Sequence, residues 1–480
     1  MVRAAGAQDA TPGASPAASP AASPVAYNGP VGTLSPDRAK VNQDINEHFK
    51  FEEAGSEGGD IIFVETTDIS TVNSILVSDT YSSWITGFLS DFLVGASPID
   101  GTWTPGLADS WEIAADGVTY TFHLHEGVKW HDGEPFTADD VVFSFDATVD
   151  EKSLSVRRGD VLSVLKSYKK IDDLTVEFVA TEPVATFIDK TVGQVGIVPK
   201  HIWGDVPVAD WGSDPGSTGT DPKRVIGNGA FKFVEWVQND HVTLEKNPDY
   251  YDAANTPVHA DHFIYRVIAD ANAAIQSIKT GESDIVEVPF AQAQALGQSN
   301  PELAISAFDT FSFNYYQLNE DPAKSPLFHD ARVRQALHYG LDRDLIAQTV
   351  YDGYAVRADG TQPILSQAYK PDQINTIYEL DVDKAKQLLA DAGWTDTDGD
   401  GIVDKDGVKM SFGLEYAEAV ATYVQQIPYM QQAWKEIGVE MIPTSTPFPV
   451  LLDHNDARSF QAQVLGFSWS VDPDQGAMFR

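Results

Sequence analysis

Residues 107–147 constrain the fold of this chain more than any other segment. Within them, Tyr120, Phe122 and Leu124 alternate with polar residues, which is the pattern of a strand with one buried face. An Asp-Gly pair at 116–117 precedes this strand and predicts a hairpin turn from an earlier strand. We therefore expect two antiparallel strands here, with their apolar residues facing a core.

The same segment continues into a helix. A turn at residues 131–135 separates the strand from Thr137, a residue type that favours the N-cap position. Asp140 stands three residues later, where a capping box usually has Glu or Gln, and apolar residues follow. The segment thus predicts a strand, a turn and a helix in direct succession.

The residues of this segment resemble one family closely. LADSW, the DG turn and YTFHLHEGVKWHDGEPFTADDVVFS are similar to the run that marks family 5 of the extracytoplasmic solute-binding proteins of ABC importers, the dipeptide, oligopeptide and nickel-binding family. His125 stands where this family commonly has Arg, and Trp130 where it commonly has Phe. VPKHIW, NPDYYD and DARVRQALHYGLDR follow in the family's order, so the resemblance extends from about residue 60 to the end.

The resemblance implies an α/β fold like that of periplasmic binding proteins, with two lobes of mixed sheets joined by a hinge. We expect residues 60–267 to form lobe I, enlarged by an extra subdomain at about 78–200, and residues 268–480 to form lobe II. Helical periodicity between two strands predicts a parallel strand pair around residues 263–288. Family members continue past the region that ends this chain, so we expect the C-terminal part to be missing.

The first 40 residues differ in composition from the rest. TPGASPAASPAASP buries too little apolar surface to offset the entropy lost on ordering. We interpret residues 1–40 as a disordered tether of an extracytoplasmic protein, in the periplasm or at the outer face of the cell membrane. A linker in a cytoplasmic protein is the alternative. Residues 1–10 lack the apolar stretch of a signal peptide, so we expect an export signal upstream of this sequence.

Charge and composition exclude several partners and chemistries. The chain has 71 acidic and 32 basic residues and a net charge of −39, which repels nucleic acid and anionic lipid. It has no cysteine, which excludes disulfides, thiolate metal sites and a cysteine nucleophile. The sequence has no run of about 18 apolar residues, so no segment is predicted to span a membrane. We expect a monomer whose partners are a small solute and the permease subunits of an importer.

An aromatic stripe after the first buried strand gives one set of ligand candidates. Residues 74–93 are expected to form a helix, in which Trp84 belongs to a stripe of aromatic and apolar residues at helical spacing. Such a stripe packs into the core more often than it binds ligand. The resemblance, however, implies that this region lines the ligand cleft, so Thr80, Tyr81 and Trp84 are candidate ligand-binding residues.

The strand-like segment FSFNYYQLN gives a second set. The resemblance implies that it borders the ligand cleft, which makes Asn314, Tyr315 and Tyr316 candidates. Successive residues of a strand point to opposite faces, so the two tyrosines cannot both face a ligand.

The end of the chain gives a third set, in the pattern W-x-x-D-P-D. In the family's peptide binders an Asp in this region accepts the α-amino group of the ligand, because an ammonium removed from water needs an opposite charge. Asp472 is the better candidate and Asp474 the weaker, with Trp469 beside them. A turn that Asp472 only caps is the alternative.

One acidic turn has the spacing of a calcium loop. Asp396, Asp398, Asp400 and Asp404 follow D-x-D-x-D-G-x-x-D, but Gly407 stands where a bidentate Glu completes such a loop. A structural Ca²⁺ and an acidic surface turn are the two interpretations. The histidines at 123, 125 and 131 with Glu126 are interpreted as a solvated strand face rather than a metal cluster.

These observations lead to one functional hypothesis and several rivals. We expect a non-enzymatic binding protein that captures oligopeptides or dipeptides between its lobes and delivers them to a membrane permease, without a cofactor. Nickel chelates and oligosaccharides are alternative cargoes. A secreted hydrolase is a rival of another class, but no G-x-S-x-G, H-E-x-x-H or P-loop is present. A calcium-dependent surface module would need tandem loops, and only one is found.

Overall fold

The computed structural model describes residues 2–4, 57–96, 102–305, 310, 312–363, 366 and 368–468. The chain divides into two compact units. Among the described residues, unit 1 contains 2–4, 269–281 and those between 286 and 468, and unit 2 contains those between 57 and 268 together with 282–285. Most of the predicted tether, residues 5–40, lies outside the described residues.

A mixed sheet of seven strands has the spatial order β13-β1-β12-β2-β11-β10-β9, and β2, β11, β10 and β9 of this sheet belong to unit 2. β2 and β11 are parallel, whereas β11, β10 and β9 pair antiparallel. The bounds are Asp60–Glu65 for β2, Phe231–Val237 for β9, His241–Lys246 for β10, His262–Val267 for β11 and Ile285–Val286 for β12.

Helix α2 (Thr80–Leu89) packs on this sheet and contributes Ile85 and Leu89 to the core around Phe63 and Tyr265. It is shorter than the predicted helix at residues 74–93. Asp79 adopts an extended backbone and accepts a hydrogen bond from Ser82 N at 2.8 Å, so the helix begins after it. The helix ends at Ser90, whose N–H still donates to Thr86 O.

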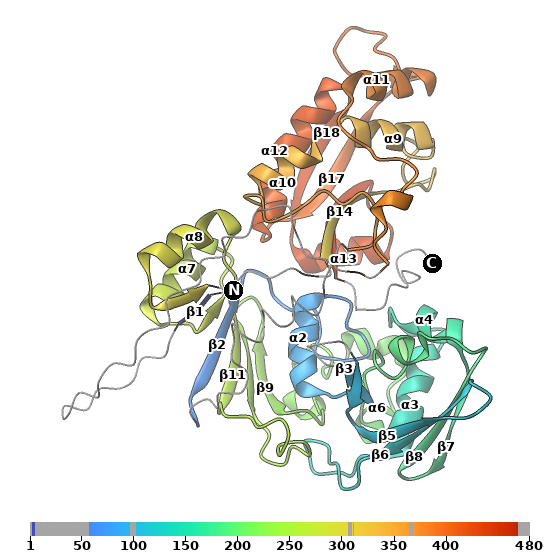
Figure 1. The fold of residues 1–480 in the computed structure, drawn as a ribbon, viewed down its shortest axis with the longest axis vertical. Helices are drawn as coiled ribbons and strands as arrows, with labels where there is room; N and C mark the ends of the chain where they lie inside the picture. Colours follow the sequence, from blue (N-terminus) through green and yellow to red (C-terminus); the bar gives the residue numbers. More distant parts are fainter. Residues whose placement is uncertain are drawn as a thin grey trace, which may run out of the picture. The chain divides into compact units, whose positions relative to one another are not determined.

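The predicted strand–turn–helix unit is confirmed in a second sheet of unit 2, with the order β5-β6-β8-β7. In Figure 1, α3 lies along this sheet. Phe122 and Phe178 of the sheet and Phe145 of α3 are fully buried, and the Phe178 ring contacts the other two. The capping box of Thr137 and Asp140 is present. The bounds are Ala108–Ile113 for β5, Thr119–Leu124 for β6, Leu165–Asp172 for β7, Thr175–Ala180 for β8 and Ala138–Val149 for α3.

Short elements complete the described part of unit 2. Two 3₁₀ turns lie between residues 208 and 224. The bounds are Val94–Ala96 for β3, Trp103–Pro105 for β4, Arg158–Val164 for α4, Phe187–Lys190 for α5, Lys200–Trp203 for α6, Val208–Ser213 for η1 and Pro222–Arg224 for η2.

Unit 1 is built on a sheet of four strands in the order β14-β19-β17-β18. β17 is parallel to both of its neighbours, and β14 pairs antiparallel with β19. Its apolar face packs on helices around the fully buried Trp434, whose indole N–H donates to Leu337 O at 3.0 Å. The bounds are Ser312–Leu318 for β14, Ser411–Ala417 for β17, Glu440–Thr446 for β18 and Ala462–Ser468 for β19.

The helices of unit 1 begin and end largely where local sequence predicts. Asp330 and Asp342 cap α9 and α10, and Gly393 and Gly438 follow the ends of α11 and α12. The bounds are Ala331–Tyr339 for α9, Arg343–Thr349 for α10, Pro371–Gln373 for η3, Val382–Asp391 for α11, Ala421–Glu436 for α12 and Phe448–Asp456 for α13.

The remaining elements of unit 1 are small. β1 pairs antiparallel with β13, and β15 pairs antiparallel with β16. The bounds are Val2–Ala4 for β1, Ala271–Thr280 for α7, Phe290–Ser299 for α8, Leu303–Ile305 for β13, Asp404–Lys405 for β15 and Val408–Lys409 for β16. In the described part of the chain, no helix is both long enough and apolar enough to cross a membrane.

The expected parallel pair around residues 263–288 is wrong in one respect. Its strand, helix and strand exist as β11, α7 and β12, and Gly281 ends the helix at a φ of 75°. The two strands are not neighbours, however, because β2 lies between β12 and β11. Periodicity identifies the elements of such a unit, but the order of strands depends on contacts with a distant segment.

Candidate functional site

The three candidates on β14 divide between its two faces, as the strand geometry requires. Asn314 and Tyr316 share one face, and Tyr315 lies on the other with Phe313, at a ring distance of 5.6 Å. Burial raises the pKa of the Tyr315 phenol to about 12. Tyr315 and Tyr316 therefore stand in different surroundings.

Tyr316 is part of the unit 1 core. Its ring lies 5.3 Å from that of Trp434 and 5.2 Å from that of His338. Its hydroxyl is buried and has no hydrogen-bond partner among the described residues, and burial raises its pKa. These contacts give Tyr316 a packing role, and its contact with ligand stays a prediction.

Asn314 has an exposed side chain that is nevertheless held in one orientation. Its Nδ2 donates to the Tyr351 hydroxyl at 2.6 Å, and its Oδ1 accepts from the Tyr423 hydroxyl at 3.3 Å. Burial raises the pKa of the Tyr351 phenol. The amide thus lies between two tyrosine hydroxyls from outside β14.

Gly466, the residue paired with Asn314 in the sheet, leaves space for these hydrogen bonds because it has no side chain. Asn314 pairs with Gly466 of β19. A Cβ at Gly466 would lie 2.6 Å from Asn314 Oδ1 and 2.8 Å from the Tyr423 hydroxyl. Glycine therefore leaves the space that the hydrogen bond between Asn314 and Tyr423 occupies.

Sequence reasoning did not identify Tyr351 or Tyr423. Tyr351 follows α10 and Tyr423 lies in the first turn of α12, so both are distant from Asn314 in sequence. Neither segment has a pattern that sets its tyrosine apart from a core residue. Only the tertiary fold brings them to the end of β14.

The candidates on α2 lie mainly in an aromatic cluster of unit 2. The Trp84 ring is 5.1 Å from that of Phe63 and 5.8 Å from that of Tyr81. Tyr81 and Trp84 are partly buried against the core, whereas Thr80 is exposed at the start of the helix. The stripe therefore packs against the sheet, and a role of these three residues in ligand binding stays a prediction.

A buried carboxylate beside this cluster was also not predicted. Asp68 is 9% exposed and accepts hydrogen bonds from Trp236 Nε1 at 3.1 Å and from the backbone N–H of Asn239 at 2.7 Å. Burial raises its pKa. Its hydrogen bonds join the segment after β2 to the β9–β10 turn, which is a structural role.

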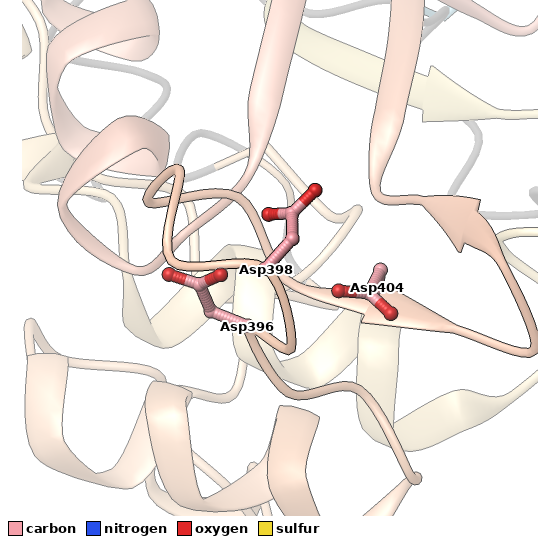
Figure 2. Close-up of side chains that lie close together, drawn as sticks. All are labelled: Asp396, Asp398 and Asp404. Carbon is pink, nitrogen blue, oxygen red and sulfur yellow. The ribbon is translucent and has the colours of Figure 1, made fainter.

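The acidic turn brings three of its four predicted carboxylates together. Figure 2 shows Asp396 and Asp398 on the turn and Asp404 on β15, and oxygens of these three groups lie within 4.8 Å of one another. Asp396 accepts from the N–H groups of Gly399 and Gly401 at 2.7 and 3.0 Å. Hydrogen bonds of this kind stabilise an acidic surface turn without a bound ion, which is the alternative interpretation to a Ca²⁺ site.

A lysine already supplies positive charge to this turn. Lys409 Nζ lies 3.0 Å from Asp398 and also pairs with Asp400, and its hydrogen bond lowers the pKa of Asp400. The carboxylates could supply oxygen ligands to a cation, but their charge is partly neutralised without one. Ca²⁺ binding stays a prediction.

The histidine-rich segment forms ordinary polar contacts. His125 pairs with Asp109 at 2.5 Å, and His131 bonds to the backbone of Gly227 and Gly229. Among the described residues, the only acidic or histidine group with the geometry for a metal ion is the acidic turn. Trp469, Asp472 and Asp474 lie outside the described residues.

Comparison with known proteins adds independent findings. The sequence pattern of a family described as bacterial extracellular solute-binding proteins, family 5 Middle, matches residues 102–480. The chain is 34% identical over 426 residues to the oligopeptide-binding protein AppA of Bacillus subtilis, covering 88% of this chain and 76% of that protein. The solved structure of AppA in complex with a nonapeptide superposes with a TM-score of 0.82 at 33% identity, covering 88% of this chain and 82% of that one.

A second relative matches over a shorter region. The dipeptide-binding protein of Escherichia coli is 30% identical over 322 residues, which cover 64% of this chain and 57% of that protein. The chain therefore spans between 57% and 76% of the length of these two relatives.

Proposed function

Because this chain belongs to family 5 of the bacterial extracellular solute-binding proteins, we propose that it captures oligopeptides outside the cytoplasm and delivers them to the permease of an ABC importer. The observation that carries this proposal is the likeness to AppA over 88% of the chain, with a nonapeptide in the AppA structure. The two-unit α/β fold agrees with a binding protein that closes over its solute.

Several residues are proposed to contact the peptide. Asn314 and Tyr315 on β14 have polar groups that suit a peptide main chain. On α2, Tyr81 and Trp84 offer aromatic rings and Thr80 offers a hydroxyl. Asp472, with Trp469 near it, is proposed to accept the ligand's α-amino group. Dipeptides, nickel chelates and oligosaccharides are the competing cargoes that an experiment must separate.

Thermal unfolding of the purified chain tests the cargo class. Each sample contains one cargo: a Gly-Ser nonapeptide, a Gly-Ser dipeptide, a nickel–histidine chelate or a mannose hexamer. A ligand at 100 times its dissociation constant adds about 2.7 kcal/mol to the free energy of unfolding, which raises the midpoint by a few degrees. A shift with the nonapeptide alone supports the proposal, whereas a shift with only the chelate or the hexamer contradicts it.

The same samples separate binding from hydrolysis. A binding protein returns the nonapeptide intact, so mass spectrometry after overnight incubation should show only the starting peptide. Release of shorter peptides in proportion to protein concentration would instead favour the secreted hydrolase. We further propose that residues 1–40 tether the protein outside the cytoplasm, which protease accessibility on whole cells would test.

A further inference from the structure

We propose that the Asn314 side-chain amide, fixed by Tyr351 and Tyr423, binds main-chain groups of one residue of the peptide, an inference that rests on the proposed function. Asn314 is exposed, and the two tyrosine bonds are its only side-chain hydrogen bonds among the described residues. A carboxamide has two N–H donors and an oxygen with two lone pairs. One donor and one lone pair therefore stay available at this surface.

An available donor and acceptor on one rigid group suit an extended peptide. In an extended chain the N–H and C=O of one residue point to the same side, as in the paired residues of an antiparallel ladder. These groups are the same in every peptide residue except proline. An amide that recognises them binds many sequences equally well, which a carrier of varied peptides requires.

The two tyrosines act as positioning residues for this amide. A free asparagine loses side-chain entropy when it binds, whereas one held between two hydroxyls has already lost most of it. Tyr351 is partly buried against the core of unit 1, which restrains the acceptor for Nδ2, and Gly466 leaves room for the bond from Tyr423. The amide is therefore pre-oriented before ligand arrives.

Backbone-ester peptides test the inference directly. We would measure dissociation constants by calorimetry for a Gly-Ser nonapeptide and for analogues in which one glycine at a time is replaced by glycolic acid, which removes one N–H. The unaltered protein should bind one analogue about three- to tenfold more weakly than the all-amide peptide. Asn314→Ala should weaken binding of the all-amide peptide by a similar factor and show no further loss with that analogue.

Two further variants separate positioning from simple packing. Tyr351→Phe and Tyr423→Phe should each reduce the difference between the ester and amide peptides, because the amide then rotates more freely. Asn319 is the matched control, since it is buried and its Nδ2 donates to the carbonyls of Arg458 and Phe460. Asn319→Ala should lower stability and leave the preference for amide over ester unchanged.

The outcomes distinguish this inference from the function it rests on. If Asn314→Ala binds the all-amide peptide as tightly as the unaltered protein, or keeps every ester effect, the inference is wrong although peptide binding stands. If the unaltered protein binds no peptide at all, both the proposed function and the inference are wrong. Loss of the ester effect in Asn314→Ala alone supports both.

Discussion

Gly466 is a position at which the structure has no room for a side chain. A Cβ there would come within 2.8 Å of both Asn314 Oδ1 and the Tyr423 hydroxyl. We expect Gly466→Ala to lower the free energy of unfolding of unit 1 by about 1–3 kcal/mol, because these two groups would have to separate. Urea denaturation measures this loss.

Gly87 provides the matched control for that substitution. It lies exposed within α2, and no heavy atom would lie within 4 Å of a Cβ there. Gly87→Ala should therefore raise stability by up to about 1 kcal/mol, because alanine loses less backbone entropy in a helix. Equal effects at the two glycines would show that the close contacts at Gly466 relax without cost.

At the residue scale, sequence could identify a candidate but not its surroundings. Asn314 and Tyr315 were predicted from the resemblance, and alternation correctly separated Tyr315 from Tyr316. The hydrogen bonds from Tyr351 and Tyr423 could not be predicted, because they join three segments that are far apart in the chain. Local sequence patterns do not predict contacts between such distant segments.

Helix α2 begins at a side chain whose contribution can be measured. Asp79 accepts hydrogen bonds from Ser82 N at 2.8 Å and from the hydroxyls of Ser82 and Ser70 at 2.7 and 2.6 Å. Asp79→Ala should lower the stability of unit 2 by about 1–2 kcal/mol, because a helix N–H and two hydroxyls lose their acceptor. Asp79→Asn keeps an acceptor oxygen and should lose less. If the two variants lose equal stability, capping is not the main role of Asp79.

The turn between α11 and β15 is the predicted Ca²⁺ site. If Ca²⁺ binds there, millimolar CaCl₂ should raise the unfolding midpoint relative to EDTA, and Asp398→Asn should abolish the rise. Lys409→Ala should increase the Ca²⁺ effect, because it removes the ammonium that pairs with Asp398 and Asp400. If Ca²⁺ changes the midpoint of neither the unaltered protein nor Lys409→Ala, the segment is an acidic turn stabilised by its own hydrogen bonds.

Elements were predicted well where their signals are local. Thr137 with Asp140, Asp330 and Asp342 mark helix starts through their own hydrogen bonds to nearby backbone. Strand β7 was missed because LKSYKKID has polar residues on both faces and only Leu165 is buried. The separation of β11 from β12 was missed because strand order depends on β2, far away in sequence.

Each of the two units contains a histidine that stays neutral when folded. In unit 2, His131 Nε2 donates to Gly229 O and Nδ1 accepts from Gly227 N, an arrangement that only the neutral ring can make. In unit 1, His338 lies between the rings of Tyr316 and Tyr378 and close to the charge of Arg343. Burial is the main cause that lowers the pKa of each histidine from 6.5 to about 4.

Mild acid should therefore destabilise both units. Between pH 6.5 and about 4 the unfolded chain binds a proton at each of these histidines and the folded chain does not, so stability falls as the pH falls. Each lowered pKa contributes at most about 3 kcal/mol, fully present above pH 6.5 and lost as the pH approaches 4. His338→Phe keeps the ring contacts and removes the titration, so it should flatten this dependence for unit 1 and leave unit 2 unchanged. Urea midpoints at several pH values, read from tryptophan fluorescence, measure both transitions, and an unaltered slope in His338→Phe would contradict the assignment.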